Sequence, residues 1–495
     1  MTAALLSAAA LTACTTSEAS TGPPAPPPSG TAEQPAGRMA VPPSTTEPPT
    51  PELAPLRTAN GRQSPGVIAA GGGDAPYNYA PSVMADGGLY RMWWCSQRGI
   101  AGPPGDDIMY AEARTLDRFD PATPVFAGSA AGFDAMHVCD PSVIRAGQTY
   151  YMYYTGSPGD HAHSNTIGVA TSPDGRVWTR AGEPIVRPAR NVSNDNVYGA
   201  GQPSAVYLDG WFYLMFTDTT GRDAGHNGAG QFVLRAKDPA FARGVEALTP
   251  GGFRAVPDTG SRWRSVVDAF SADLMWVDAL AAFAIAHETA GGTTITFWDK
   301  DFRINPYRPI LVEGPWREGP GLVRRADGHA VIPLHTPCET VPIDLVRATR
   351  EGPAGPTDLK HFGLDLIDVD ACATAPRALL TLNGYAMPSP TRTIDLIIAG
   401  TIVRVDRRSV AEALATLILN HRIPALDKVP VATHLTPKLP ALRAPARGTA
   451  LLIDNHLWPL SPLTALDRNS STITDITPTQ WDTYDRGVDL VAPPR

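Results

Sequence analysis

Three acidic residues stand at the starts of similar short segments and could together carry out acid–base chemistry. The segments begin Asp140-Pro141-Ser142-Val143, Asp268-Ala269-Phe270 and Glu318-Gly319-Pro320. Carboxyl groups that meet at one site can divide the roles of general base and general acid, because a neighbouring negative charge raises the pKa of one of them. We therefore take Asp140, Asp268 and Glu318 as candidate catalytic residues.

The three segments belong to an internal repeat that runs through residues 67–355. Its copies are aligned at positions 80, 140, 202, 268 and 318, which are 60, 62, 66 and 50 residues apart. Each copy holds a short strand, a glycine-containing turn and a second strand rich in aromatic or β-branched residues, which is typical of a hairpin. Four strands in about 60 residues is the size of a propeller blade. The sequence therefore predicts an all-β fold, a five-bladed β-propeller.

A propeller would bring the aligned positions together, because the first strand of every blade lines the central axis. The first and third copies carry Ala80 and Gln202 at this position, and neither side chain exchanges a proton. Only the second, fourth and fifth copies supply acids. The fourth copy has an uncertain register, so Asp273 is an alternative to Asp268. The Glu-Gly-Pro triplet occurs twice, at Glu313 and at Glu318; we choose Glu318 because the next residues form the strand, and Glu313 is the alternative.

Three motifs resemble glycoside hydrolase family 43 and its five-bladed relatives over about residues 75–350. They are the Asp-Pro-Ser-Val strand start, the strand Tyr-Tyr-Met-Tyr-Tyr-Thr-Gly and the turn Ala-Thr-Ser-Pro-Asp-Gly before Trp178. The resemblance implies an enzyme that cleaves β-xylosides or α-arabinofuranosides in oligo- or polysaccharides with inversion. It implies that Asp140 is the base, Asp268 raises the pKa of the acid, and Glu318 donates the proton. Inversion requires the base and the acid to stand about 6.5–9.5 Å apart.

Other interpretations of these residues remain open. If the first copy matches the first blade of the family, Ala80 and Gln202 replace two acids, and the chain is a glycan-binding propeller without turnover. An aspartate before proline also often bonds its own backbone in a turn.

Four further residues are candidates for binding a sugar. Aromatic rings stack on sugar rings, and Tyr79 and Trp316 lie nearest the expected mouth of the propeller; His137 and Gln202 stand close to or at repeat positions. The sequence holds no Cys-x-x-Cys pair, His-Glu-x-x-His motif or EF-hand loop. We therefore expect no metal and no cofactor.

The N-terminal residues indicate export. Residues 1–14 are an apolar run that ends at Cys14 and resembles a lipoprotein signal, with a lipid attached to Cys14. Residues 15–66 are rich in proline, which predicts a disordered tether to the outer face of the cell membrane or the cell wall. After export, four cysteines permit two disulfides, for instance Cys95 with Cys139 and Cys338 with Cys372.

Composition restricts the partners. The chain has 41 basic and 49 acidic residues, a net charge of −8, so a nucleic-acid-binding surface is not expected. No run of 18 apolar residues occurs, so we expect contact with a membrane through the lipid alone. Residues 356–495 lose the repeat and predict an accessory α+β module with a helix from Val410 and a weak twofold similarity, either glycan-binding or a buttress for the propeller.

Overall fold

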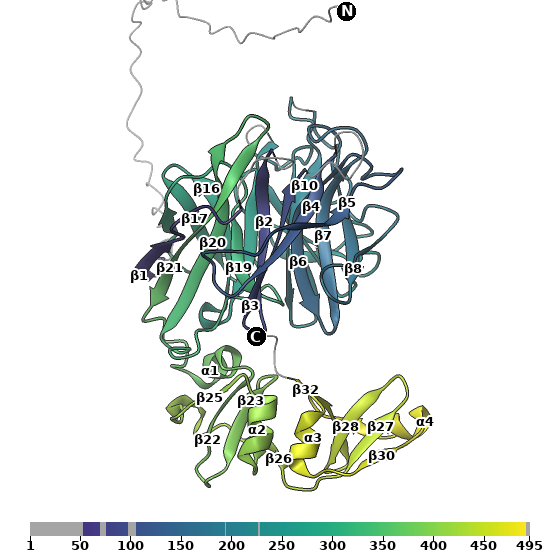
Figure 1. Ribbon diagram of the computed structural model, residues 1–495, viewed down its shortest axis with the longest axis vertical. Helices are drawn as coiled ribbons and strands as arrows, with labels where there is room; N and C mark the ends of the chain where they lie inside the picture. Colours follow the sequence, from purple (N-terminus) through teal and green to yellow (C-terminus); the bar gives the residue numbers. More distant parts are fainter. Residues whose placement is uncertain (1–52, 70–75, 98–104, 194, 226–227, 492–495) are drawn as a thin grey trace, which may run out of the picture. The chain divides into compact units, whose positions relative to one another are not determined.

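The computed structural model describes residues 53–69, 76–97, 105–193, 195–225 and 228–491 (Figure 1). The expected signal segment with Cys14, and the expected tether up to residue 52, lie outside these residues. The secondary structure of the described part is mostly β-strand, arranged in several sheets. Within it, we find no helix that is long and apolar enough to span a membrane.

The first four repeats each form an antiparallel set of strands in chain order. Set one holds β2 (Asn78–Asp86), β3 (Leu89–Ser96), β4 (Asp107–Ala113) and β5 (Thr123–Ala127). Set two holds β6 (His137–Ala146), β7 (Thr149–Ser157), β8 (Thr166–Ser172) and β9 (Thr179–Arg180). Set three holds β10 (Ala200–Leu208), β11 (Trp211–Asp218), β12 (Gln231–Ala236), β13 (Glu246–Thr249) and β14 (Gly252–Ala255). Set four holds β15 (Ala272–Val277), β16 (Ala282–Thr289), β17 (Gly292–Trp298) and β18 (Ile310–Glu313), with the short 3-10 helix η2 (Asp278–Leu280) between β15 and β16.

The hairpins follow from turn residues that tolerate a left-handed backbone. Gly87 and Gly88, between β2 and β3, have φ values of 63° and 78°. Asp209 and Gly210, between β10 and β11, have φ values of 51° and 78°. Two consecutive positive φ angles define the type I′ turn, whose twist matches that of an antiparallel pair.

A fifth set differs from the sequence expectation at both ends. It holds β19 (Gly321–Arg325), β20 (Thr340–Glu351), β21 (Pro356–Ile367) and, beside β21, the N-terminal strand β1 (Arg57–Gln63) (Figure 1). The expected tether boundary at residue 66 and the expected domain boundary at residue 355 are therefore wrong. The polar strand β1 has no alternating pattern, and the Arg62 guanidinium fastens it by bonding Asp344 at 2.7 Å and Asp365 at 2.8 Å.

The first strands of the five sets contact one another in a cyclic order: β2, β6, β10, β15, β19 and again β2. Side-chain oxygens tie these strands together, each accepting a hydrogen bond from a backbone N–H of the next set. The bonds run from Val143 to Ser82 at 3.0 Å, Ala205 to Ser142 at 2.9 Å, Leu274 to Ser204 at 2.8 Å and Leu322 to Asp273 at 2.7 Å. Between β19 and β2 the link is direct parallel pairing.

This ladder corrects the expected register of the last two repeats. The aligned positions of the first three sets share a left-handed backbone, with φ values of 47° at Ala80, 48° at Asp140 and 50° at Gln202. In the ladder, Asp273 is the acceptor of the fourth set, as Ser82, Ser142 and Ser204 are in the first three. Each of these serines lies two residues after its aligned position, so the aligned position of the fourth set is Ser271 and not Asp268. In the fifth set the equivalent is Gly319, with φ 58°, one residue after Glu318. The fourth repeat lacks the Pro-Ser pair that marks the first three.

The C-terminal residues form two sheets with the same strand order, which confirms the twofold similarity. The orders are β25-β22-β23-β24-β26 and β30-β27-β28-β29-β31. The first copy holds β22 (Tyr385–Pro388), β23 (Ile394–Ile398), β24 (Thr401–Val405), α2 (Arg408–Leu414), β25 (Leu417–Ile418), η3 (Pro424–Leu426) and β26 (Val431–Leu435), after α1 (Ala375–Thr381). The second holds β27 (Ala441–Ala444), β28 (Gly448–Ile453), β29 (His456–Ser461), α3 (Thr464–Asn469), β30 (Ile473–Asp475), α4 (Pro478–Trp481), β31 (Asp485–Arg486) and β32 (Leu490–Val491). The predicted helix ends at Leu414, earlier than its apolar run, because Leu417–Ile418 pairs with β22 as a strand.

Two disulfides are present, and both pairings are those the sequence offered. Cys95–Cys139 joins β3 of the first set to β6 of the second. Cys338–Cys372 joins the segment before β20 to the segment after β21.

Candidate active site

A cavity of about 410 Å³ opens where the first strands of the sets begin. Five of the predicted site residues line it: Asp140, Glu318, Tyr79, His137 and Gln202. Asp268 and Trp316 are not among the residues that line it. The aligned positions also meet in a smaller space, which is lined by Ala80-Pro81, Asp140-Pro141, Gln202-Pro203, Ser271-Ala272-Asp273 and Gly319-Pro320.

Asp140 lies in the wall of the cavity and is only 6% exposed. Burial raises the pKa of its carboxyl group, since a charge is less stable away from water. Two donors oppose this by favouring the ionised form: the Thr155 hydroxyl at 2.8 Å and the Tyr198 hydroxyl at 3.4 Å from Oδ2. Its other oxygen, Oδ1, has no hydrogen-bond partner among the described residues. Asp140 is thus a buried carboxylate with an unused acceptor.

Glu318 faces the same cavity, and the pKa of its carboxyl group is raised as well. Burial, and then the charges of Asp140 and Glu351, raise the pKa of its carboxyl group to about 8. Gln202 Nε2 donates to Glu318 Oε1 at 3.2 Å and only partly opposes this rise. At neutral pH Glu318 is therefore mostly protonated and can donate a proton. Glu313, the alternative in the first Glu-Gly-Pro triplet, is exposed and is not part of the lining.

The fourth set contributes no acid to this cavity. Asp268 is exposed, and the register correction explains why it does not point with the others. Asp273 is buried, accepts from Ser204 and from the Leu322 backbone, and lies 3.3 Å from the Arg324 guanidinium. These contacts use its oxygens to hold the innermost strands, so its role is structural.

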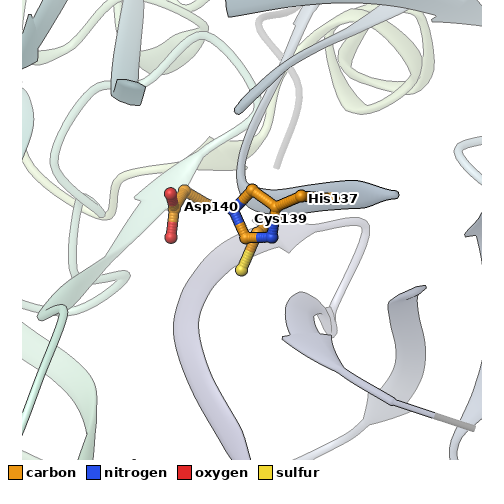
Figure 2. Close-up of side chains that lie close together, drawn as sticks. All are labelled: His137, Cys139 and Asp140. Atoms are coloured by element: carbon orange, nitrogen blue, oxygen red, sulfur yellow. The ribbon is translucent and has the colours of Figure 1, made fainter. Parts of the chain in front are cut away.

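His137, Cys139 and Asp140 form a cluster whose candidate ligand atoms lie within 4.8 Å of one another (Figure 2). A metal would need a Cys139 thiolate, but this sulfur belongs to the disulfide with Cys95. His137 also turns Nδ1 to the Asp106 carboxylate, which accepts a second bond from Tyr77. The Cys139 sulfur and His137 Nδ1 are therefore both engaged in contacts other than with an ion.

Aromatic and polar residues complete the cavity. Burial, followed by the charges of Asp140 and Glu318, raises the pKa of the Tyr79 hydroxyl well above its usual range. Tyr198 packs edge-on against Phe270 with ring centroids 4.9 Å apart. Trp316 instead donates its indole N–H to the Thr289 carbonyl at 2.8 Å.

Sequence reasoning missed several residues at the site. Asp106, Tyr77 and Phe270 reach the cavity from loops or strand ends outside the repeat motif. Thr155 lies inside the aromatic strand β7 and reads as an ordinary strand residue. No sequence signal distinguishes it, because its bond to Asp140 depends on the pairing of β6 with β7.

Comparisons with known proteins bear on the same region. The family model described as Glycosyl hydrolases family 43 matches residues 134–245, a span that includes Asp140 and Gln202. Two proteins of Mycobacterium tuberculosis strains, Uncharacterized protein MT1551 and Uncharacterized protein Rv1502, are each 32% identical over 107 residues. The match covers 21% of this chain and 34% of each relative, so the chain spans about a third of the length of these curated relatives.

Two solved structures are similar over a larger share of the chain. A family 117 glycoside hydrolase of the marine bacterium Zobellia galactanivorans is 15% identical, with 63% of this chain and 92% of that chain covered and a TM-score of 0.44. The catalytic domain of a GH62 alpha-L-arabinofuranosidase of Coprinopsis cinerea is 13% identical, with 62% and 97% covered and a TM-score of 0.41.

Proposed function

We propose that this chain hydrolyses pentose-containing glycans with inversion, with Asp140 as general base and Glu318 as general acid. The match to the model of glycoside hydrolase family 43 supports a glycosidase. Its substrates are oligo- or polysaccharides. The observation that carries the proposal is the pair of carboxyl groups in one cavity. Burial raises the pKa of both carboxyl groups, but Asp140 has two donors that favour its ionised form, whereas the charge of Asp140 adds to the rise that takes the Glu318 pKa to about 8. Inverting hydrolysis needs one carboxylate to activate water and one carboxylic acid to protonate the leaving oxygen.

A five-bladed propeller is the architecture that we propose for the five sets of strands. The cyclic contacts of the first strands support it, as does the repeated bond from each set to the next. In such a ring, Asp140 from the second set and Glu318 from the start of the fifth approach one mouth from different sides. The strand β1 would then complete the last blade from the N-terminal end of the chain.

The charge of the cavity supports a neutral substrate. Among the described residues that line it are three acids, Asp106, Asp140 and Glu318, and no lysine or arginine. A uronate or sulfate group would bring negative charge to these carboxylates without a cation to pair with it. Neutral pentosides, such as arabinofuranosides and xylosides, avoid that repulsion and can pack against Tyr79 and Tyr198.

One observation favours the second candidate, a glycan-binding propeller without turnover. Ser271 stands at the aligned position of the fourth set, so the expected third carboxylate is not at the cavity. Asp268 is therefore left out of the proposed pair. The two candidates differ in turnover, and one experiment separates them.

The test uses aryl α-L-arabinofuranosides and aryl β-D-xylosides, with proton NMR of the first-formed product anomer. The proposal predicts turnover with inversion, a loss of about 100-fold to 10,000-fold in Asp140→Asn, and a similar loss in Glu318→Gln on unsubstituted phenyl glycosides, whose leaving oxygen is basic. Asp268→Asn is the matched control and should retain activity, because Asp268 is exposed outside the cavity. Binding of arabinan or xylan without turnover of any glycoside would favour the second candidate.

We also propose export, with a lipid on Cys14 that tethers the protein to the outer face of the cell membrane or the cell wall. The two disulfides support an oxidising compartment. Expression of the full chain with a radiolabelled fatty acid tests this: label should enter the membrane fraction with the wild type and not with Cys14→Ala. Equal labelling of both would contradict it.

A further inference from the structure

Two uncharged side chains connect the proposed base to the proposed acid. The Thr155 hydroxyl donates to Asp140 Oδ2 at 2.8 Å and accepts from the Gln202 backbone N–H at 2.8 Å. The Gln202 side chain then donates to Glu318 Oε1 at 3.2 Å. Thr155 is fully buried and Gln202 is 7% exposed. Thr155 and Gln202 thus link the two carboxyl groups through three hydrogen bonds and the covalent bonds between the Gln202 backbone and its side-chain amide.

The backbone conformation at Gln202, which Ala80 and Asp140 share at the other aligned positions, allows this residue to make both of its bonds in the bridge. Gln202 has a φ of 50°, a left-handed conformation that side-chain-bearing residues rarely adopt, at a break in the pairing of β10 with β11. In this conformation the backbone N–H of Gln202 points to Thr155 of the second set, and the side chain of Gln202 reaches Glu318, which precedes the first strand of the fifth set. Gln202 therefore bonds Glu318 directly and is linked to Asp140 through Thr155.

An amide suits the two charge states that a general acid passes through in every turnover. Nε2 can donate to an ionised Glu318, and Oε1, which has no partner in this structure, can accept from the protonated form after the amide turns. A methionine at this position could do neither, and a carboxylate could accept but not donate.

We propose that Thr155 and Gln202 are positioning residues that hold the Asp140 and Glu318 carboxyl groups in one arrangement and retain Glu318 in both of its charge states. This inference rests on the proposed function, because it treats the two carboxyl groups as base and acid. It adds a specific role for Gln202, which the sequence had offered only as a substrate ligand.

The bridge has a consequence for the pH range of activity. The Thr155 bond favours the ionised form of Asp140, and the Gln202 bond favours the ionised form of Glu318, so losing either bond raises the pKa of its carboxyl group. The other groups that act on Asp140 are His137, Asp106 and the Tyr198 hydroxyl. Glu318 also feels Asp140 and Glu351, and both carboxylates face Tyr79. The substitutions of Thr155 and Gln202 below alter none of these groups.

The experiment measures kcat/KM against pH for an aryl arabinofuranoside or xyloside, whichever is turned over. In Thr155→Val the acidic limb should move up by about one pH unit, while the alkaline limb stays in place. In Gln202→Met the alkaline limb should move up by about one unit, and in Gln202→Glu further, because a second carboxylate then faces Glu318. Thr155→Ser keeps the hydroxyl and should restore the wild-type acidic limb.

A second readout does not require turnover. Carbon-13 NMR of protein labelled at the glutamate carboxyl carbons should show the Glu318 titration, assigned with Glu318→Gln, moving to higher pH in Gln202→Met. Folded variants with unmoved limbs and an unmoved Glu318 titration would overturn the inference, even if their melting temperatures fell. Full activity in Asp140→Asn or Glu318→Gln would refute the proposed function instead, and the NMR titration would still decide whether Gln202 is coupled to Glu318.

Discussion

The buried ion pair of Asp218 and Arg262 offers a stability test whose size can be worked from the structure. Both side chains are fully buried, and Arg262 Nε donates to Asp218 Oδ2 at 2.9 Å. The same carboxylate accepts from the backbone N–H groups of Ala189 and Thr220, each at 2.9 Å. Arg262 also donates to the carbonyls of Thr259 and Arg187. The pair therefore fastens three loops, two of which lead to the cavity residues Tyr198 and Phe270.

Asp218→Asn should destabilise the protein by about 3–5 kcal/mol, because it leaves the Arg262 charge buried without a counter-ion. Urea unfolding followed by tryptophan fluorescence measures this change. The double variant Asp218→Asn/Arg262→Met, which removes the stranded charge, should be more stable than Asp218→Asn alone. Asp209→Asn is the surface control, since its ion pair with Lys300 is exposed, and it should cost less than about 1 kcal/mol.

Two results would refute this reasoning. One is an Asp218→Asn variant within about 1 kcal/mol of the wild type, which would mean that water or rearrangement satisfies Arg262. The other is a double variant less stable than the single one, which would place the energy in the loop contacts of Arg262 rather than in its charge.

Three further predictions concern stability. His329 faces the Asp278 carboxylate with Nδ1 at 3.1 Å and the Tyr207 carbonyl with Nε2 at 3.0 Å, so the ring must donate twice and carry a charge. Burial lowers the His329 pKa, but the charges of Asp278 and Asp327 outweigh it, so the pKa is raised overall. The charged ring therefore stabilises the folded protein fully below about pH 6.5, and this stabilisation is lost as the pH rises through the folded-state pKa. The melting temperature should consequently fall less with rising pH in His329→Gln than in the wild type. Cys95→Ala/Cys139→Ala, which opens a link across 44 residues, should cost about 4 kcal/mol in urea unfolding and loosen the start of β6 around Asp140. An unchanged unfolding midpoint would show that packing alone holds the two sets together. Deleting residues through Gln63 removes β1 and exposes the edge of β21, so light scattering should show aggregation, whereas deleting only residues 1–52 should not.

The sequence predicted those parts of the fold that repeat. The Pro-Ser pairs at positions 81–82, 141–142 and 203–204 mark equivalent strand starts, and the structure places all three in one ladder. The fourth copy replaces the serine with Asp273 and has no proline before it, so the sequence alignment chose Asp268, three residues too early. The strand β1 was missed because its pairing partner lies about 300 residues away, and no local pattern encodes that pairing.

The site was predictable only where an unusual residue type interrupts a pattern. Asp140 and Glu318 stand out as charges at the ends of apolar strands, and both reach the cavity. Thr155 and Asp106 could not be recognised, because a threonine in a strand and an aspartate in a loop are ordinary until pairing brings them to Asp140 and His137.

The most direct test of the central claim, that Glu318 is the acid and Asp140 the base, is the dependence of kcat/KM on the leaving group. A proton donor matters most when the departing oxygen is strongly basic, whereas a base is needed for every substrate. If Glu318 is the acid and Asp140 the base, kcat/KM of Glu318→Gln should fall about 100-fold or more on an alkyl glycoside and little on the dinitrophenyl glycoside. In Asp140→Asn, kcat/KM should fall equally on both. Equal losses in Glu318→Gln on the two substrates, or full activity of either variant on the alkyl glycoside, would contradict it.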